Sequence, residues 1–268
     1  MTGVTVIMPS WNQGRWIRQS LASMMGDPAI TEILVMDRRS TDATAAVVQG
    51  YPLARIVLRD RTVMDAIWDG IERARTEWIV VGFTSDWFEP LAVSVLLAAA
   101  ERLPRIAYVG AGTIVHEMDG RRRLKLPAPG WLTADDVIDD GQAPGITLLR
   151  RSLALQVGWP PLRDDHAIYT GYLLRALTHG WTARRLARPL VHFRRHARSI
   201  SGNSAHGEAG HAETIEHRRL LATQYAGALT LAQCERLRHP ATGYERPWPR
   251  MKRRLARWWY APSQEGTS

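Results

Sequence analysis

The sequence is poor in cysteine and has no long apolar run. Cys234 is the single cysteine among 268 residues, which excludes an internal disulfide framework and a cysteine-based metal cluster. No uninterrupted apolar stretch approaches the length of a membrane span, and no basic-then-apolar signal precedes the strand-like residues 4–8. We therefore expect a cytoplasmic protein in a reducing compartment.

Acidic residues are also in deficit. Lysine and arginine together number 35 against 26 aspartates and glutamates, which gives a formal net charge of +9. A basic protein is attracted to anionic partners, such as nucleic acid, a phosphorylated substrate or a membrane face. We expect no nucleic acid, because the sequence has no recognised nucleic-acid module and its basic residues are dispersed except near the end of the chain.

The first part of the chain alternates between short apolar runs and segments with a helical period. Such runs predict strands, and apolar residues three and four apart predict helices. Strands are predicted at residues 4–8, 32–36 and 56–58 and in the segment 76–88 ahead of Asp86, and helices at 15–25, 43–49 and 63–73. Ser40 or Thr41 is a candidate cap for the helix at 43–49. This order is typical of an α/β protein with a mostly parallel sheet, which binds ligands along the carboxyl edge of its strands.

The second part of the chain mixes shorter elements. The expected elements are a helix at 90–102, a strand at 106–115, a hairpin or exposed loop at 116–129, a helix at 133–140, a strand at 145–149, and helices at 152–157 and 168–179. Gly180 is placed to end the last of these helices. Residues 181–191 lead the chain towards Arg194, and from residue 206 onward the pattern is helical.

A polar triplet follows the apolar run at 78–81 and ends in Asp86. A carboxylate at the carboxyl edge of an open sheet is suited to hold a metal ion against the phosphates of a ligand. The alternative is that Ser85 and Asp86 only open a turn or cap the following helix.

Four segments together resemble a known family. They are Val-Ile-Met-Pro-Ser-Trp-Asn at 6–12, a strand ending in Asp37 with a Ser-Thr-Asp turn at 33–42, a helix and Glu-Trp-Ile strand at 65–79, and Phe-Arg-Arg-His-Ala-Arg-Ser-Ile-Ser at 193–201. In order and spacing they resemble the motifs of the family 2 glycosyltransferases of the GT-A fold. That family is an inverting class that uses nucleotide-sugar donors.

The resemblance implies a domain organisation and a set of partners. We expect a GT-A domain at 1–203 with a Rossmann-like central sheet flanked by helices, divided into a nucleotide-sugar-binding half at 1–115 and an acceptor-binding half at 116–203. A helical C-terminal extension occupies 204–268. The implied partners are a nucleotide-sugar donor and a saccharide or lipid-linked acceptor, in polysaccharide or glycan biosynthesis, and the implied cofactor is Mn²⁺ or Mg²⁺.

The resemblance also implies site residues. The positions expected to bind the nucleotide sugar are Pro9, Ser10, Trp11, Asn12, Asp37, Arg38, Asp60, Asp65, Ser85 and Asp86. Trp11 offers a stacking face for the base, and Asp60 is either an acid near the base or a plain turn residue. Asp86 and His196 are the expected metal ligands, although a histidine among arginines is otherwise more often a surface residue.

Some expected acids are replaced. Arg38 takes the place of a second acid after the second strand, where a cation could meet a phosphate instead. Phe83 and Ser85 stand where the family has acids, so Asp86 is the single carboxylate of this motif. Magnesium sites often use one or two carboxylates together with substrate phosphates. The alternative function is a catalytically silent relative that binds sugar nucleotide or partners an active transferase.

The position of the general base also departs from the family pattern. Tyr169 stands where the family has the aspartate that deprotonates the acceptor, and tyrosine, with an ordinary pKa of about 10, is a poor base at neutral pH. Asp165, one helical turn earlier, and Asp164 are the candidate catalytic residues. Both could instead be solvated charges at the start of a helix.

The end of the chain predicts a basic amphipathic helix. From residue 250 to 260 apolar residues recur at helical spacing, including Trp258 and Trp259, and five basic residues occupy the other faces. This pattern favours adsorption of residues 247–260 to an anionic membrane surface, at the inner face of the membrane. The alternative is a helix packed on its own domain.

Overall fold

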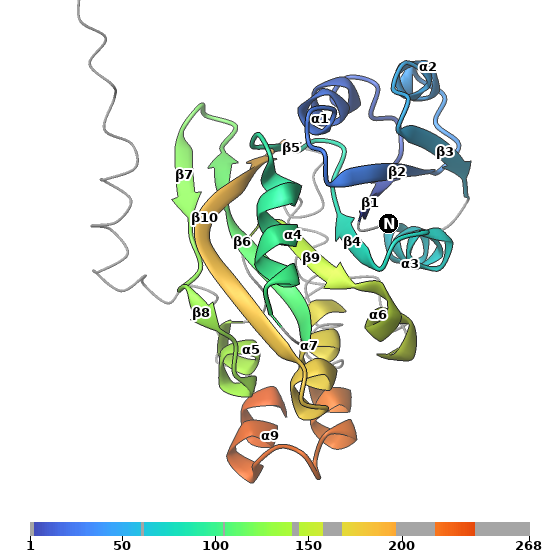
Figure 1. Ribbon diagram of the computed structural model, residues 1–268. Coiled ribbons are helices and arrows are strands. Elements are labelled where there is room, and N and C mark those ends of the chain that lie inside the picture. Colours follow the sequence, from blue (N-terminus) through green and yellow to red (C-terminus); the bar gives the residue numbers. More distant parts are fainter. Residues whose placement is uncertain are drawn as a thin grey trace, which may run out of the picture.

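The computed structural model describes residues 3–59, 62–103, 105–140, 145–157, 168–196 and 218–238. A ten-stranded sheet with the main order β3-β2-β1-β4-β9-β6-β10-β5 runs through these residues (Figure 1). The predicted α/β class is confirmed, and the order of the first four strands is that of a Rossmann-like half.

The N-terminal half is a parallel β/α unit. Its elements are β1 (Val4–Ser10), α1 (Ile17–Met24), β2 (Ile30–Asp37), α2 (Thr44–Gln49), β3 (Ala54–Leu58), α3 (Val63–Arg73) and β4 (Trp78–Val81). The pairs β1/β2, β2/β3 and β1/β4 are all parallel, and Ser10 lies opposite Asp37 at the carboxyl ends of β1 and β2. The turns after β1, β2 and β4 therefore meet at one edge of the sheet.

The second half is mixed. Its elements are β5 (Trp87–Phe88), α4 (Ala92–Glu101), β6 (Ile106–His116), β7 (Arg122–Lys125), β8 (Gly130–Trp131), α5 (Ala134–Asp140), β9 (Thr147–Arg150), α6 (Arg151–Val157), α7 (Ile168–Thr178), β10 (Thr182–Arg194) and α9 (Leu231–Arg238). Strand β9 runs antiparallel to both β4 and β6, whereas β10 is parallel to β6. The parallel pairing predicted from β/α alternation thus holds for β1–β4 and for β6/β10.

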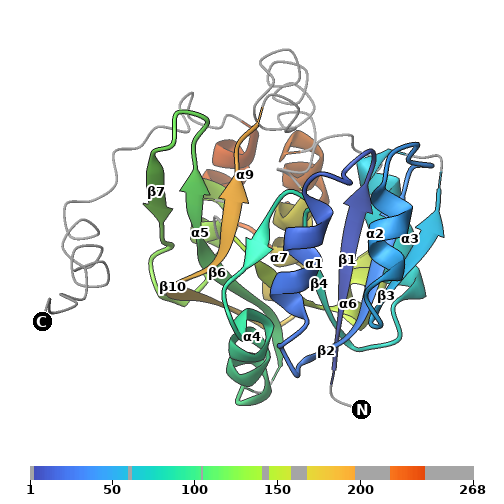
Figure 2. The same cartoon turned by 90° about the horizontal axis from the view of Figure 1, so that it is seen from above.

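Apolar side chains are buried on both faces of the sheet. One core cluster packs α1, α2 and α4 on one face, and the other packs α3, α5, α6, α7 and α9 on the opposite face (Figure 2). Residues 33–36 of β2 are at most 1% exposed. A strand covered on both sides reads as a continuous apolar run, which is why this strand was visible in the sequence.

Local turn chemistry sets several boundaries. Helix α3 begins after Thr62, whose hydroxyl accepts from the backbone N–H of Asp65 while donating to its carboxylate, a reciprocal cap. The hairpin expected at 116–129 is present as the antiparallel pair β6/β7. The expected cap of α2 by Ser40 or Thr41 is wrong, because Ala43 precedes this helix and Asp42 accepts the hydrogen bond from the backbone of Thr44.

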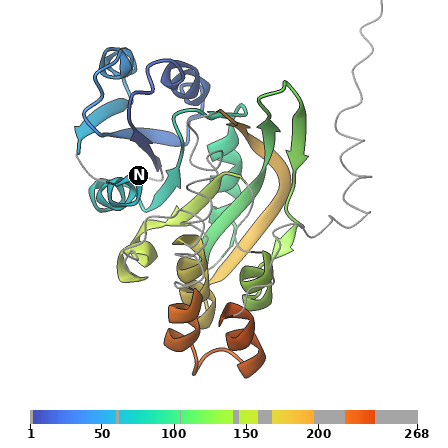
Figure 3. The same cartoon turned by 180° about the vertical axis from the view of Figure 1, so that it is seen from behind.

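The C-terminal helices belong to the main core. Leu221, Tyr225 and Leu237 lie in the same cluster as α5 and α7, and Figures 1 and 3 show α5, α7 and α9 gathered at one end of the molecule. The helical pattern predicted after residue 206 is confirmed at 218–224 and in α9. A separate extension beginning at residue 204 remains a prediction, and residues 247–260 lie outside the described residues.

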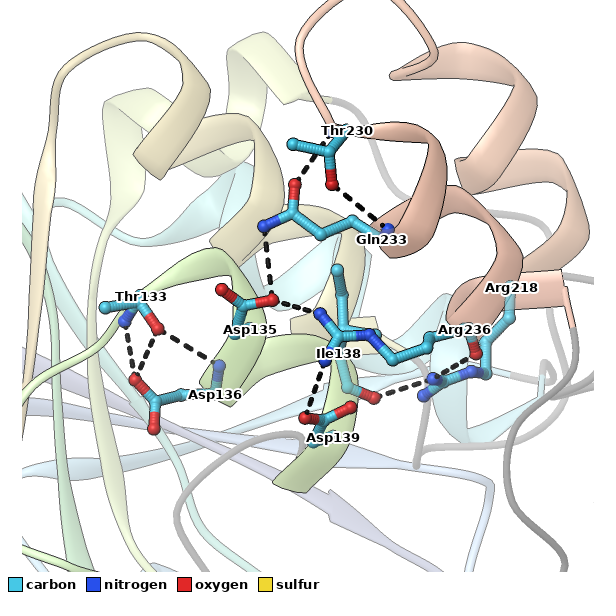
Figure 4. Close-up of polar contacts among 9 residues, drawn as sticks. All are labelled: Thr133, Asp135, Asp136, Ile138, Asp139, Arg218, Thr230, Gln233 and Arg236. Atoms are coloured by element: carbon cyan, nitrogen blue, oxygen red, sulfur yellow. Dashed lines mark hydrogen bonds and ion pairs between the residues drawn. The ribbon is translucent and has the colours of Figure 1, made fainter.

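Polar contacts fix these helices to α5 (Figure 4). Arg218 is 8% exposed and its Nη2 donates to the backbone carbonyl of Ile138 at 2.6 Å. Arg236 pairs with Asp135 and Asp139 at the surface. Thr230 and Gln233 form a reciprocal cap at the start of α9. Within the described residues, no helix is long and apolar enough to span a membrane.

We expect Arg218→Ala to lower the free energy of unfolding by about 2 kcal/mol, because a buried charge-assisted hydrogen bond is lost. Urea unfolding of the whole chain measures this. Arg238→Ala is the matched control: its guanidinium pairs with Glu235 one turn earlier, and such surface pairs contribute about 0.5 kcal/mol or less. Equal losses in the two variants would contradict the anchoring role of Arg218.

Candidate active site at the carboxyl edge of the sheet

The turns after β1 and β2 are bonded to each other. The backbone N–H of Asn12 donates to Ser40 Oγ at 2.7 Å, and the N–H of Thr41 donates to Asn12 Oδ1 at 2.9 Å. Ser40 donates from both its N–H and its hydroxyl to the carboxylate of Asp37, which is 1% exposed. Asp37 and Asn12 therefore shape this rim of the site through hydrogen bonds within the protein.

Trp11 and Arg38 are the exposed part of this rim. The indole of Trp11 is 58% exposed, and the Arg38 guanidinium lies 5.7 Å from its ring centroid. An open aromatic face beside a cation suits a base and a phosphate of one ligand. Pro9 and Ser10, by contrast, are buried at the end of β1.

Asp86 lies in the turn between β4 and β5. Strand β4 ends at Val81, beside β1, so this turn follows the same sheet edge. The Asp86 carboxylate is 5% exposed; its Oδ1 accepts from the backbone N–H of Arg194 at 3.1 Å and from Ser85 Oγ at 3.4 Å. Burial raises the pKa of Asp86 to about 7, and these two hydrogen bonds oppose the rise only partly.

Arg194 connects the halves of the molecule at this point. Its guanidinium lies 4.2 Å from the ring centroid of Trp16 and 4.7 Å from that of Trp87. It also donates to Ser85 O at 3.2 Å and to Gln19 Oε1 at 2.5 Å. Burial lowers the pKa of this guanidinium. The end of β10 is thereby held against α1 and against the turn that carries Asp86.

His196 joins the same cluster through Trp16. The two rings stack with their centroids 6.2 Å apart, and Trp16 also contacts the guanidinium of Arg194, whose backbone holds Asp86. The structure thus brings both predicted metal ligands into one neighbourhood. Across the described ranges, no three carboxylate, imidazole or thiolate groups converge as a metal site.

The remaining predicted residues are placed differently. Asp65 is exposed and bonded to Thr62 in the cap of α3. Asp60, Asp164 and Asp165 lie outside the described residues, so their roles stay predictions. Tyr169 is 9% exposed and belongs to the core cluster beneath the sheet, which agrees with the view that it is not the base.

Sequence reasoning missed three polar side chains beside Asp86. Glu89 Oε1 lies 2.7 Å from His192 Nε2, and His192 Nδ1 lies 2.9 Å from His116 Nε2. The Trp87 ring stacks on His192 at 4.7 Å and touches His116 at 4.6 Å. The one signal in the sequence was that His116 directly follows a predicted strand at the same edge as Asp86.

Replacing Asp86 by Asn is expected to stabilise the metal-free protein above neutral pH. The folded protein binds the Asp86 proton more tightly than the unfolded chain does, because burial raises its pKa to about 7. The contribution of the bound proton to the free energy of unfolding is fully present below the pKa of Asp86 in the unfolded chain. It is lost as the pH rises through 7. At about 1.4 kcal/mol per pKa unit, the gain in Asp86→Asn at pH 8 approaches about 4 kcal/mol.

Urea unfolding at pH 4 and pH 8 measures this gain. The two proteins should differ at pH 8 and converge at pH 4. Glu101→Gln, at an exposed carboxylate at the end of α4, is the matched control and should change neither midpoint. Identical midpoints for wild type and Asp86→Asn at pH 8 would show that Asp86 is not desolvated.

Solved structures share this fold. A crystal structure of S. aureus TarS superposes with a TM-score of 0.66 at 14% identity, covering 90% of this chain and 44% of the TarS chain. Two structures of TarS 1–349 give TM-scores of 0.68 at 16% identity, in complex with UDP-GlcNAc, and 0.62 at 14% identity, in complex with UDP. Each covers 88% of this chain, and they cover 70% and 69% of theirs.

At these low sequence identities, the superpositions establish a common fold. The chain spans less than half of the longer TarS chain, and no curated protein matches it in sequence. The family described as Glycosyl transferase family 2 matches residues 5–173, which is more than half of the chain. The bonded turns after β1 and β2 and the carboxylate after β4 all fall inside this match, and the chain belongs to glycosyl transferase family 2.

Proposed function

We propose that this chain is a hexosyltransferase that moves a sugar from a nucleotide-sugar donor to a saccharide or lipid-linked acceptor, with inversion at the anomeric carbon, in polysaccharide or glycan biosynthesis. The observation that carries the proposal is the buried carboxylate of Asp86, held at the same sheet edge as the bonded turns after β1 and β2. Open parallel sheets bind ligands at this edge.

The donor would lie across the edge from Trp11 to Asp86. Its base would stack on the exposed indole of Trp11, and Arg38 would meet a phosphate. The TarS structures in complex with UDP and UDP-GlcNAc make uridine nucleotides the first donors to test. The similarity to TarS supports the fold needed for such a ligand, while the choice of sugar and base belongs to this proposal.

The donor set at Asp86 fits Mn²⁺ or Mg²⁺. One buried carboxylate is deprived of solvent, so a cation beside it would restore its ionised form. His196 is in the same cluster, and magnesium sites commonly combine one or two carboxylates with substrate phosphates. When bound, the ion would supply positive charge to the nucleoside diphosphate leaving group.

A catalytically silent protein is the second candidate. Phe83, Ser85 and Arg38 stand at positions where the family has acids, and the described residues hold no protein-only metal site. Such a protein would bind sugar nucleotide, or partner an active transferase, without turnover. Turnover therefore separates the two candidates, and binding alone does not.

We expect the purified protein to bind a nucleotide sugar in the presence of Mn²⁺ or Mg²⁺ and to hydrolyse it slowly. Calorimetry with UDP-, GDP- and dTDP-sugars measures binding, and release of free nucleoside diphosphate measures hydrolysis. Asp86→Ala should abolish the metal-dependent part of binding, because it removes the buried carboxylate. Asp119→Ala, in the β6–β7 hairpin and paired with Arg121, is the matched control and should bind normally.

The outcomes separate the candidates. Metal-dependent binding with turnover supports the transferase. Binding without metal and without turnover on any acceptor favours the silent protein. Absence of binding to every nucleotide sugar in the panel would contradict both.

We also propose that residues 247–260 adsorb to the inner, anionic face of a membrane from the cytoplasm. Five basic residues at 250–257 would each contribute about 1 kcal/mol near such a surface. Deleting residues 247–260 should abolish co-sedimentation with phosphatidylglycerol vesicles. Phosphatidylcholine vesicles are the control and should bind neither form, and undiminished binding of the deletion variant to anionic vesicles would refute the role of this segment.

A further inference from the structure

Three side chains form a hydrogen-bonded row beside Asp86. Glu89 follows β5, His192 lies near the end of β10, and His116 ends β6. The row runs from Glu89 Oε1 to His192 Nε2 at 2.7 Å, and from His192 Nδ1 to His116 Nε2 at 2.9 Å. Figure 2 shows β10 between β6 and β5, so the row crosses three neighbouring strands.

When Glu89 is ionised and both imidazoles are neutral, the row sets which imidazole nitrogens carry protons. An ionised Glu89 is only an acceptor, so His192 donates to it from Nε2. Neutral His192 then has no proton on Nδ1, and this nitrogen accepts the hydrogen bond from Nε2–H of His116. His116 in turn is left with an unprotonated Nδ1. The far end of the row is therefore a lone pair able to accept a proton.

The row is fixed close to the candidate site. Trp87 directly follows Asp86 and packs against both imidazoles. His116 lies opposite Arg194 in the β6/β10 register, and the backbone N–H of Arg194 holds Asp86. The backbone carbonyl of His116 accepts from Arg195 N at 2.9 Å. His116 is thus one strand away from the residue that binds the buried carboxylate.

The charged groups around His116 favour its neutral form. Burial, the neighbouring His192, and the cations Arg122 on β7 and Arg194 on β10 lower the pKa of His116 below the ordinary value for histidine. A base must be unprotonated at working pH, and a histidine with a lowered pKa meets this condition at neutral pH.

We propose that His116 is the general base of the transfer reaction, with His192 and Glu89 as positioning residues that set its tautomer. This assignment rests on the proposed function and replaces the prediction that Asp164 or Asp165 is the base. Nδ1 of His116 takes the proton of the acceptor hydroxyl. The acceptor oxygen forms the new bond to the anomeric carbon while the bond from that carbon to the diphosphate oxygen breaks. The nucleoside diphosphate leaves with that electron pair.

The resting protonation pattern can be measured without any variant. Long-range ¹H–¹⁵N correlation spectra of the wild-type protein at pH 8 distinguish protonated from bare imidazole nitrogens. We expect bare Nδ1 and protonated Nε2 on both His116 and His192. A protonated Nδ1 with a bare Nε2 on His116 would overturn the proposal, because its free nitrogen would then be a donor.

Hydrolysis of UDP-GlcNAc, with water in place of the acceptor, tests the chemical role. His116→Gln should lower the rate by about 10²- to 10⁴-fold, the usual contribution of a general base, and should leave UDP-GlcNAc binding unchanged. His179→Gln is the matched control, since His179 follows α7 and bonds to the backbone carbonyl of Arg175. Its rate should equal that of the wild type.

The pH profile tests the positioning residues. At saturating Mn²⁺, which keeps Asp86 ionised, the wild-type rate should rise with pH as His116 loses its proton, and His116→Gln should lose this rise. Glu89→Gln keeps an acceptor for His192 but removes the negative charge. The imidazolium form of His116 is then less stabilised, so the rise in rate should move to lower pH. If Glu89 had a purely structural role, the rise in rate would stay at the same pH, and this result would count against the proposed role of the row.

The outcomes also separate this inference from the proposed function. If the wild type neither binds nor hydrolyses any nucleotide sugar, the proposed function fails, and the assignment of His116 as the base fails with it. If the wild type hydrolyses UDP-GlcNAc and His116→Gln does so equally fast, only the assignment of His116 as the base is overturned.

Discussion

The hydrogen bond from the backbone of Arg194 to the carboxylate of Asp86 joins two parts of the chain that are 108 residues apart. The Arg194 side chain adds a second connection, since its guanidinium contacts both Trp16 of the first half and Trp87 of β5. The parallel β1–β4 unit and the mixed second half are thus fixed to each other where the ligand is expected to bind. A shift of β10 would move Asp86, His192 and His196 together.

Burying Asp86 is unfavourable for the protein without ligand. Among the described residues, the carboxylate accepts from two donors, one at 3.1 Å and one at 3.4 Å, and neither is a charged side chain. Unfavourable burial of a polar group is common at binding sites, where the surrounding structure maintains it and a bound ligand offsets its cost. The same desolvation would strengthen the attraction between Asp86 and a divalent ion, because a low local dielectric amplifies charge interactions.

Much of the fold was predictable because its signals are local. Strands β1 and β4 are buried along their whole length and β2 along most of it, and they read as largely apolar runs. The expected bounds of α3 match those observed, because its buried apolar residues recur at helical spacing. The reversal of β9 was not predictable, since the direction of a short apolar run is not visible in its composition. Asp86 was found because it follows such a run. Glu89, His192 and His116 were missed because the two bonded pairs are 103 and 76 residues apart and meet only when β5, β6 and β10 pair.

The cross-bonded turns after β1 and β2 affect how quickly a ligand can be captured. Asn12 adopts a left-handed backbone conformation with φ of 51°, and its N–H and its side-chain oxygen bond to Ser40 and Thr41 of the other turn. Both loops are therefore already in place, and little further ordering is required when a nucleotide arrives. Association at this rim would be governed by diffusion and by the attraction of the basic chain for phosphate, whereas the lifetime of the complex would depend on the buried carboxylate at the other end of the site.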